Sequence, residues 1–408
     1  MLPVVSTSRG PVLLILTSAF LTAAANGISI VAFPWLVLQR TGSAVDASVV
    51  AGAATLPLLF ATLLSGTAVD FLGRRQIAML SDAMSALSVA AIPVLALSAG
   101  IEAVNTAVLA GLAALGAFFD PAGMTARLSM LPEAAERAGW TLDHTNSVYE
   151  ASFNLGYITG PGIGGLLIAT LGGVETMWVT AGAFGISIAA MAMVRLAGAD
   201  RPAPDQRPDG VVSGLLEGLR FVWRNRVLRT LGLIDLAATG LYLPMESVLF
   251  PKYFTDRNEP AQLGWVMMAL SLGGLVGALS WTVLSRFASR RATVLTAVLT
   301  YGAASVAIAF LPPLPVILAL VAVVGLVYGP IGPIYNSVMQ TRTPAHLRGR
   351  VVGVMTSMAY AAGPVGFMLA GPLVDAFGLK AAFLALAAPI LVIGLLCPLI
   401  PALRELDR

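Results

Sequence analysis

Hydrophobic residues fill this chain in long runs that are interrupted only by short polar breaks. A helix needs about 20 predominantly apolar residues to cross the hydrocarbon core of a bilayer. The runs are too long for strands and lack the alternation of a membrane β-barrel. The pattern predicts an all-α integral membrane protein with transmembrane helices over residues 11–38, 45–70, 76–99, 104–131, 143–171, 174–196, 227–255, 262–285, 291–311, 314–341, 350–374 and 379–402.

Composition supports this interpretation. Charged residues make up 11% of the 408 residues, whereas a soluble domain carries roughly a quarter. So few charges cannot build a water-soluble surface, so most of the exterior must face lipid. The first hydrophobic run lacks a small-residue cleavage site, which favours a span over a removed signal peptide.

The distribution of basic residues predicts the orientation. With the N-terminus in the cytoplasm, the basic residues that fall outside are Arg40, Lys252, Arg257 and Lys380. Those on the cytoplasmic side are the arginines of the polar segment at about 197–226 and Arg9, Arg74, Arg75, Arg127, Arg137, Arg286, Arg290, Arg291, Arg342, Arg348, Arg350, Arg404 and Arg408. This asymmetry obeys the positive-inside rule. Twelve spans, with both termini cytoplasmic, fit it.

The twelve predicted spans divide into two halves. A segment rich in proline and charge, RPAPDQRPDG, begins at Arg201 and separates them. The Gly160-Pro161 pair of the fifth span recurs as Gly363-Pro364 in the eleventh. Two six-helix halves around a site at the membrane midplane are typical of secondary transporters. We therefore expect two pseudo-symmetric six-helix bundles, 1–198 and 227–408, joined by a cytoplasmic linker, 199–226.

The loop between the second and third spans reads GTAVDFLGRR. Gly66 and Gly73 permit a tight turn, and Asp70 can lie against a helix N-terminus or an arginine. Arg74 and Arg75 hold the loop inside and can pair with carboxylates. The spacing Gly-x-x-x-Asp-x-x-Gly-Arg-Arg resembles motif A, the gating loop of the major facilitator superfamily. The alternative is an ordinary positive-inside loop.

The fifth span reads GYITGPGIGG from Gly156. Gly156, Gly160, Gly164 and Gly165 allow another helix to approach closely, and Pro161 removes a backbone hydrogen bond. The pattern resembles motif C, the antiporter signature of drug exporters in the same superfamily. The alternative is a close-packing helix with no bearing on transport direction.

The resemblance extends over the whole chain, through segments such as NGISIVAFPWLVLQRTGS, LGAFFDPAGMTARLSMLPE, LYLPMESVLFPKYFTD and HLRGRVVGVMTS. These segments are similar to the drug:proton antiporter branch with twelve spans, and within it to the Tap group of mycobacterial efflux pumps. The resemblance implies proton-coupled export of tetracycline, spectinomycin and aminoglycoside-type antibiotics by alternating access. We expect a monomer in a bacterial plasma membrane, whose partners are small-molecule drugs, protons and the lipid bilayer.

Five carboxylates fall within the predicted spans: Asp82, Asp120, Glu150, Asp235 and Glu246. An ionisable group inside a bilayer is costly unless it is paired or hydrated, so each is a functional candidate. Asp235 and Glu246 are separated by about three helical turns, roughly 16 Å along the axis, and point to nearly the same face. We expect them, with Glu150, to couple protons or hold a cationic substrate.

Other roles remain open for these acids. Glu246 could instead cap an external cavity or pair with an arginine. Asp120 is hypothesised to pair with Arg74 when the cytoplasmic side is closed, which would link it to motif A, although a structural salt bridge is an alternative. Asp82 is expected to be interfacial and structural.

Polar side chains in otherwise apolar helices are candidates to line a substrate cavity, with interhelical packing as the alternative for each. They are Asn26, Asn146, Tyr149, Asn154, Tyr157, Tyr242, Tyr328, Tyr335 and Asn336.

Other functions fit less well. A secondary exporter of a native metabolite, siderophore or lipid would share the bundle and motif A. A membrane-embedded enzyme is disfavoured because His144 and His346 are the only histidines and no HExxH motif exists, so no metal or cofactor is expected. No Gly-Lys-Ser/Thr sequence is available to bind nucleotide phosphates. The small net charge of +3 does not mark nucleic-acid binding. The choice of protons over sodium rests on the resemblance alone.

Overall fold

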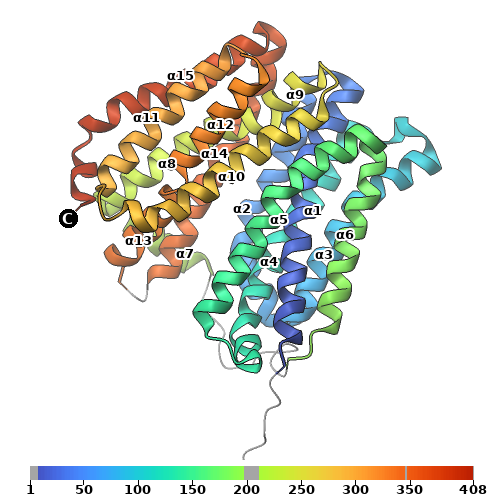
Figure 1. The fold of residues 1–408 in the computed structure, drawn as a ribbon, viewed down its shortest axis with the longest axis horizontal. Coiled ribbons are helices and arrows are strands. Elements are labelled where there is room, and N and C mark those ends of the chain that lie inside the picture. Colours follow the sequence, from blue (N-terminus) through green and yellow to red (C-terminus); the bar gives the residue numbers. More distant parts are fainter. Residues whose placement is uncertain (1–7, 197–210, 345–346, 408) are drawn as a thin grey trace, which may run out of the picture. The chain divides into compact units, whose positions relative to one another are not determined.

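The computed structural model describes residues 8–196, 211–344 and 347–407, and these residues contain helices and no β-strand (Figure 1). The predicted all-α fold is therefore confirmed. The first helices are α1 (Gly10–Thr41), α2 (Ala44–Leu72), α3 (Arg74–Ala99), η1 (Ile101–Ala103), α4 (Thr106–Ala138), α5 (Leu142–Leu171) and α6 (Gly173–Met193). The later ones are α7 (Val211–Arg224), α8 (Arg226–Pro244), η2 (Met245–Leu249), α9 (Phe250–Thr255), α10 (Pro260–Leu284), α11 (Arg290–Ala309), α12 (Leu314–Tyr328), α13 (Ile331–Arg342), α14 (Arg348–Phe377), α15 (Leu379–Leu396), η4 (Cys397–Leu399) and η5 (Pro401–Glu405).

The chain divides into two compact units. Unit 1 comprises Met1–Leu36 and Ala53–Arg207, and unit 2 comprises Val37–Gly52 and Pro208–Arg408. The end of α1 and the start of α2 therefore belong to the second unit, although both helices precede the centre of the chain.

By length and composition, 11 helical stretches among the described residues could cross a membrane. Three of these stretches combine shorter elements. Arg226–Thr255 contains α8, η2 and α9, Leu314–Met339 contains α12 and most of α13, and Leu379–Leu399 contains α15 and η4. The remaining predicted span, 143–171, corresponds to the 30-residue helix α5. Polar residues occupy the first half of α5, which explains its lower hydropathy.

Two spans depart from regular α-helix. Met245–Leu249 forms a π-helical turn directly after Pro244. Such a turn inserts one extra residue into a helix and is frequent at functional sites. In the tenth span, Gly329 and Pro330 interrupt a helix that the sequence predicts as continuous over 314–341. Proline lacks the N–H group needed for the helical hydrogen bond, so α13 begins only at Ile331.

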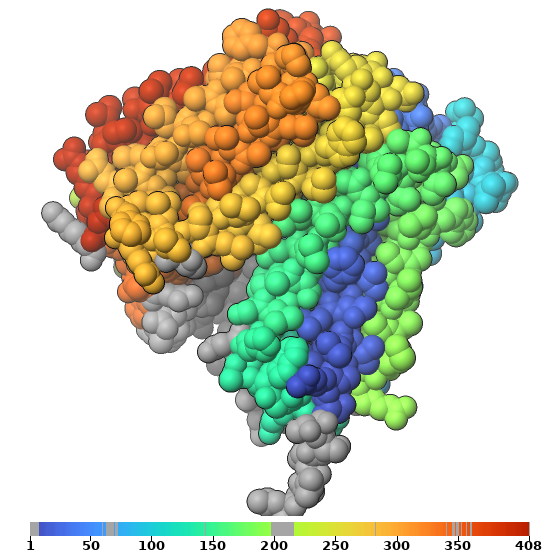
Figure 2. Space-filling view, viewed as in Figure 1, coloured from blue at the N-terminus to red at the C-terminus, as the bar shows by residue number. Residues whose placement is uncertain are grey.

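Within unit 1, α1 lies between α5 and α6 on the face shown in Figure 2. Three glycines on one side of α5 allow this approach. A β-carbon added at Gly156 would lie 2.3 Å from the carbonyl oxygen of Phe20, and one at Gly160 would lie 2.5 Å from that of Ala24. Gly164 continues the same contact one turn later. The glycine pattern therefore brings the backbones of α1 and α5 together.

Within unit 2, α10 and α12 pack through a reciprocal pair of Gly-x-x-x-Gly motifs. The glycines are Gly273 and Gly277 on α10, Gly325 on α12, and Gly329 at the C-cap of α12. A β-carbon added at any of them would lie between 2.1 and 2.3 Å from a carbonyl oxygen of the facing helix. Real contacts of that length do not occur, so this helix pair requires glycine at all four positions.

The predicted linker, 199–226, contains a helix. Residues 199–210 lie outside the described part of the chain, but α7 follows directly. Its Val222 is fully buried in the hydrophobic core of unit 2, whereas Leu216, Leu219 and Trp223 are exposed. Because these exposed residues are spaced at three and four positions, they share one face of α7.

Candidate functional site

The interior of unit 1 holds an ion pair between Asp82 of α3 and Arg127 of α4. Asp82 is 0% exposed and Arg127 is 3% exposed. Arg127 was counted among the basic residues on the cytoplasmic side and lies within the predicted span 104–131; in the structure it is a buried residue of α4, which continues to Ala138. Asp82 was expected to be interfacial and structural; its carboxylate is fully buried against side chains of α1, α4 and α6, which fits the structural role.

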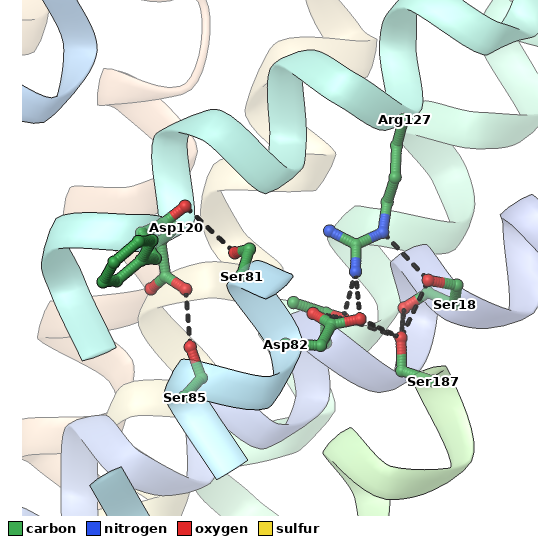
Figure 3. A network of polar contacts seen from close by, with 9 residues as sticks. Ser18, Ser81, Asp82, Ser85, Asp120, Arg127 and Ser187 are labelled. Carbon is green, nitrogen blue, oxygen red and sulfur yellow. Dashed lines mark hydrogen bonds and ion pairs between the residues drawn. The ribbon is translucent and has the colours of Figure 1, made fainter. Parts of the chain in front are cut away.

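Three hydroxyl groups complete this cluster (Figure 3). Arg127 donates from Nε to Ser18 and from Nη2 to Thr22, both at 2.9 Å. Thr22 donates to Asp82 Oδ1 at 2.9 Å, and Ser187 donates to Asp82 Oδ2 at 2.7 Å. A buried charge is tolerated when it is paired and its remaining polar atoms are hydrogen-bonded. The cluster therefore connects α1, α3, α4 and α6 at one point.

Asp120 lies two turns before Arg127 on α4. Its Oδ1 atom accepts a hydrogen bond from Ser85 of α3 at 3.1 Å, and the side chain of Asn26 lies beside the carboxyl group. Figure 3 shows Ser81, one turn from Ser85, donating to the backbone next to Asp120 at 2.9 Å. Arg74 and Asp120 are both described, and they form no ion pair in this structure. The predicted partnership therefore remains a hypothesis about another conformation.

The motif A segment forms the turn between α2 and α3. Gly73 occupies this turn with a φ of 92°, a conformation that favours glycine. Arg74 and Arg75 begin α3, and Arg75 donates from Nη1 to the carbonyl oxygen of Val194 at 3.3 Å. Val194 is the C-cap of α6, so this arginine satisfies the end of a neighbouring helix. Gly66 and Asp70 lie on α2, and the surroundings of both residues fall outside what the structure describes.

The predicted residues on α5 differ in their environments. Tyr149 is 1% exposed and packs in the core of unit 1. Asn146 and Glu150 are exposed, and Asn154 is half-buried. Tyr157 is exposed and stacks on Phe153, with ring centroids 6.4 Å apart. Of the motif C residues, Pro161 and Gly165 are buried along with the glycines that contact α1.

In unit 2, Asp235 of α8 meets a tyrosine of α12. Tyr328 donates its hydroxyl hydrogen to Asp235 Oδ1 at 3.1 Å. Two residues that the sequence analysis selected separately, Asp235 and Tyr328, are therefore in contact with each other and join α8 to α12. Tyr335 instead donates to the backbone carbonyl of Leu231 at 3.1 Å, which indicates a structural role, and Asn336 is exposed.

Glu246 lies within the π turn, and the side chain of Tyr242 lies beside its carboxyl group. Tyr242 contacts Tyr301 edge-on at 5.9 Å, and Tyr301 contacts Tyr328 edge-on at 5.8 Å, measured between ring centroids. A series of three tyrosines therefore lies between the two acids of the seventh span. Tyr301 is absent from the sequence-based candidates, although a tyrosine within the apolar ninth span is the signal that could have identified it.

The arrangement supplies carboxyl and hydroxyl groups within helices of mostly apolar residues. Among the described residues, His, Cys, Asp and Glu do not gather in groups of three that could hold a metal ion. The chemistry available is reversible proton binding at carboxyl groups and hydrogen bonding to a solute.

Comparison with known proteins gives consistent results. The family model described as Major Facilitator Superfamily matches residues 15–367 and 258–405. A protein of Mycolicibacterium fortuitum named multidrug efflux pump Tap is 69% identical over 402 residues, which cover 98% of each chain. A protein of the same name from Mycobacterium tuberculosis is 65% identical over 98% of this chain and 96% of its own.

More distant proteins also align. The enterobactin exporter EntS of Escherichia coli O1:K1 is 30% identical over 298 residues, or 71% of this chain and 68% of its own length. Among solved structures, the nucleoside transporter NupG aligns with a TM-score of 0.76 at 13% identity, over 95% of this chain and 98% of that one. A D-xylose-proton symporter aligns with a TM-score of 0.73 at 10% identity, over 97% and 99%. These two structural matches support the fold alone.

Proposed function

Because the chain belongs to the Major Facilitator Superfamily, we propose that it is a proton-coupled antiporter that exports antibiotics from the cytoplasm. The observation that carries the proposal is its high identity, over nearly its whole length, to proteins named multidrug efflux pump. The substrates we propose are tetracycline, spectinomycin and aminoglycoside-type compounds.

Proton coupling is assigned to Asp235 and Glu246, with Glu150 as a third candidate. Asp235 is supported by its contact with Tyr328, which leaves the other carboxylate oxygen available for a proton or a cationic group. Glu246 is supported by its position in a π turn beside Tyr242. A carboxyl removed from bulk water favours its neutral form, so it can load a proton on one side and release it on the other.

Alternating access is the transport cycle we propose for the predicted bundles 1–198 and 227–408. In it, the motif A turn at Gly73 and Arg75 would hold the cytoplasmic ends of the helices, and the α1–α5 contact of motif C would close the pathway on the other side. The protein would lie in a bacterial plasma membrane with both termini in the cytoplasm. These assignments extend the positive-inside pattern and the motif resemblances.

The test measures accumulation of labelled tetracycline in cells that carry the wild type or the double variant Asp235→Asn/Glu246→Gln. We expect low accumulation with the wild type, and restored accumulation after addition of a protonophore or with the double variant. Asp375→Asn is the matched control, because this carboxylate is exposed near the end of α14 and should not affect export.

Two results would contradict the proposal. Equal accumulation in wild-type and empty cells, with the protein present in the membrane, would exclude tetracycline as a substrate. In the second result, the double variant still exports tetracycline, and the protonophore abolishes that export. Export would then be proton-coupled, but Asp235 and Glu246 would not be the residues that couple it.

A second candidate function is export of a native metabolite of the siderophore type. The similarity to the enterobactin exporter EntS favours it over other metabolite classes. It would be preferred if cells lacking the protein retained a catecholate compound internally while their antibiotic accumulation stayed unchanged.

A further inference from the structure

A cavity of about 230 Å³ lies inside unit 2, between α8, α10, α11 and α12. Three tyrosines line it, one from each of α8, α11 and α12: Tyr242, Tyr301 and Tyr328. Its remaining walls are mostly apolar or small side chains. A smaller cavity of about 20 Å³ adjoins it and shares Tyr242 and Tyr301 as walls, so Tyr301 borders both spaces.

The cavity exists because glycines line part of it. Gly325 and Gly329 belong to the close contact between α10 and α12, and both border the cavity. Gly274, one residue after the packed Gly273, also borders it, but a β-carbon added at Gly274 would meet no heavy atom within 4 Å. Two adjacent glycines therefore differ: Gly273 is required for packing, and Gly274 leaves space open.

Tyr301 presents an unusual hydroxyl group. Its side chain is 3% exposed, and its oxygen has no hydrogen-bond partner among the described residues. The hydroxyl group of Tyr328, in contrast, donates a hydrogen bond to Asp235. A buried polar group without a partner costs about 1–3 kcal/mol, so native structures rarely leave one without a functional reason. A solute that enters the cavity could supply the missing partner.

We propose that this cavity is a subsite for one planar aromatic ring system of an exported compound, with a polar substituent of that ring bonded to Tyr301. The inference rests on the proposed export of antibiotics. Edge-on and stacked contacts with three tyrosines suit an aromatic ring. A cavity of about 150 Å³ accommodates benzene, whereas complete drug-sized ligands need about 300–1,000 Å³. The space therefore fits one or two fused rings, and the remainder of the molecule extends outside it.

The experiment compares two antibiotics of different ring chemistry. Tetracycline contains a fused phenolic ring, and spectinomycin contains no aromatic ring. Dissociation constants are measured for both on the purified full-length protein in lipid nanodiscs. Gly274→Leu fills the cavity without a backbone clash, and Gly182→Leu is the matched control, since Gly182 is exposed on α6 with open space around it.

We expect Gly274→Leu to weaken tetracycline binding about tenfold or more, because the ring loses its apolar contact area. Tyr301→Phe keeps the aromatic wall and removes one hydrogen bond, so it should weaken tetracycline binding about two- to tenfold. Spectinomycin binding should not change in either variant, and Gly182→Leu should bind both drugs as the wild type does.

Three outcomes would overturn the inference. Unchanged tetracycline binding in both cavity variants would show that the ring lies elsewhere. If Gly274→Leu weakened the binding of both drugs to the same extent, the substitution would have damaged the helix bundle, and the effect would not indicate a ring-specific subsite. A wild-type protein that binds neither drug would refute the proposed substrates, and the ring subsite with them. Measuring the wild type first therefore separates failure of the proposed function from failure of the subsite.

Discussion

Replacing Asp82 by asparagine tests the buried charge cluster of unit 1 with little change in shape. Thr22 and Ser187 donate to different oxygens of the carboxylate, so the single amide oxygen of asparagine can retain only one of these two hydrogen bonds. Also lost is the negative charge opposite Arg127, whose guanidinium is 3% exposed and cannot reach bulk water. The substitution therefore removes the negative charge and one hydrogen-bond acceptor, and the uncompensated charge of Arg127 is the larger of the two costs.

The magnitude follows from the burial of both partners. Removing one member of a buried ion pair costs about 3–5 kcal/mol, whereas replacing both members by uncharged groups is often nearly neutral. With about 2–4 °C per kcal/mol for a unit of this size, Asp82→Asn should lower the melting temperature by about 6–20 °C. The double variant Asp82→Asn/Arg127→Met should recover most of that loss.

Thermal unfolding of the detergent-purified protein, followed by intrinsic tryptophan fluorescence, measures these differences. Asp120→Asn is the control, because Asp120 is only half-buried and forms no ion pair with a described residue. The reasoning would be refuted if Asp82→Asn melted with the wild type, or if the double variant melted below the single one.

Two further predictions concern packing. Gly277→Ala would place a β-carbon 2.1 Å from the carbonyl oxygen of Leu326, so we expect a lower yield of monodisperse protein in size-exclusion chromatography, while Gly182→Ala, which meets no neighbour, should match the wild type. Equal yields would contradict the close contact of α10 and α12. Tyr335→Phe removes one hydrogen bond to the Leu231 carbonyl and should cost about 0.5–1.5 kcal/mol of stability without changing tetracycline accumulation. Loss of export at unchanged melting temperature would instead assign Tyr335 to transport.

The fold could be predicted from the sequence because hydropathy alone determines which segments enter lipid. Runs of about 20 apolar residues have few alternatives, so helix positions follow directly from residue type. The family resemblance seen in the loop and glycine motifs was confirmed by the family model and by close relatives. Interruptions such as Gly329-Pro330 were missed because a hydropathy window averages over single residues.

The candidate sites could be predicted only in part. Asp235 and Tyr328 were identified as isolated polar residues, but their contact depends on how α8 and α12 face each other. The predicted span 104–131 contains Arg127, as α4 does, but the sequence did not predict its ion pair. The acid that pairs with an arginine inside a helix depends on how the helices pack. Here the partner, Asp82, lies 45 positions away in the chain.

The π turn at Met245–Leu249 has a consequence for insertions and deletions in the seventh span. An α-helix advances about 100° per residue, and the wider π turn absorbs one extra residue without passing that rotation on to the helix that follows. Deleting one residue within the turn would therefore restore regular helical hydrogen bonding and leave α9 facing the same way relative to α8. Deleting one residue outside the turn, with the π turn kept, would rotate α9 by about 100°. The length of this span and the direction in which its second half faces are therefore linked, and a relative without the π turn must carry a one-residue gap to keep the same register.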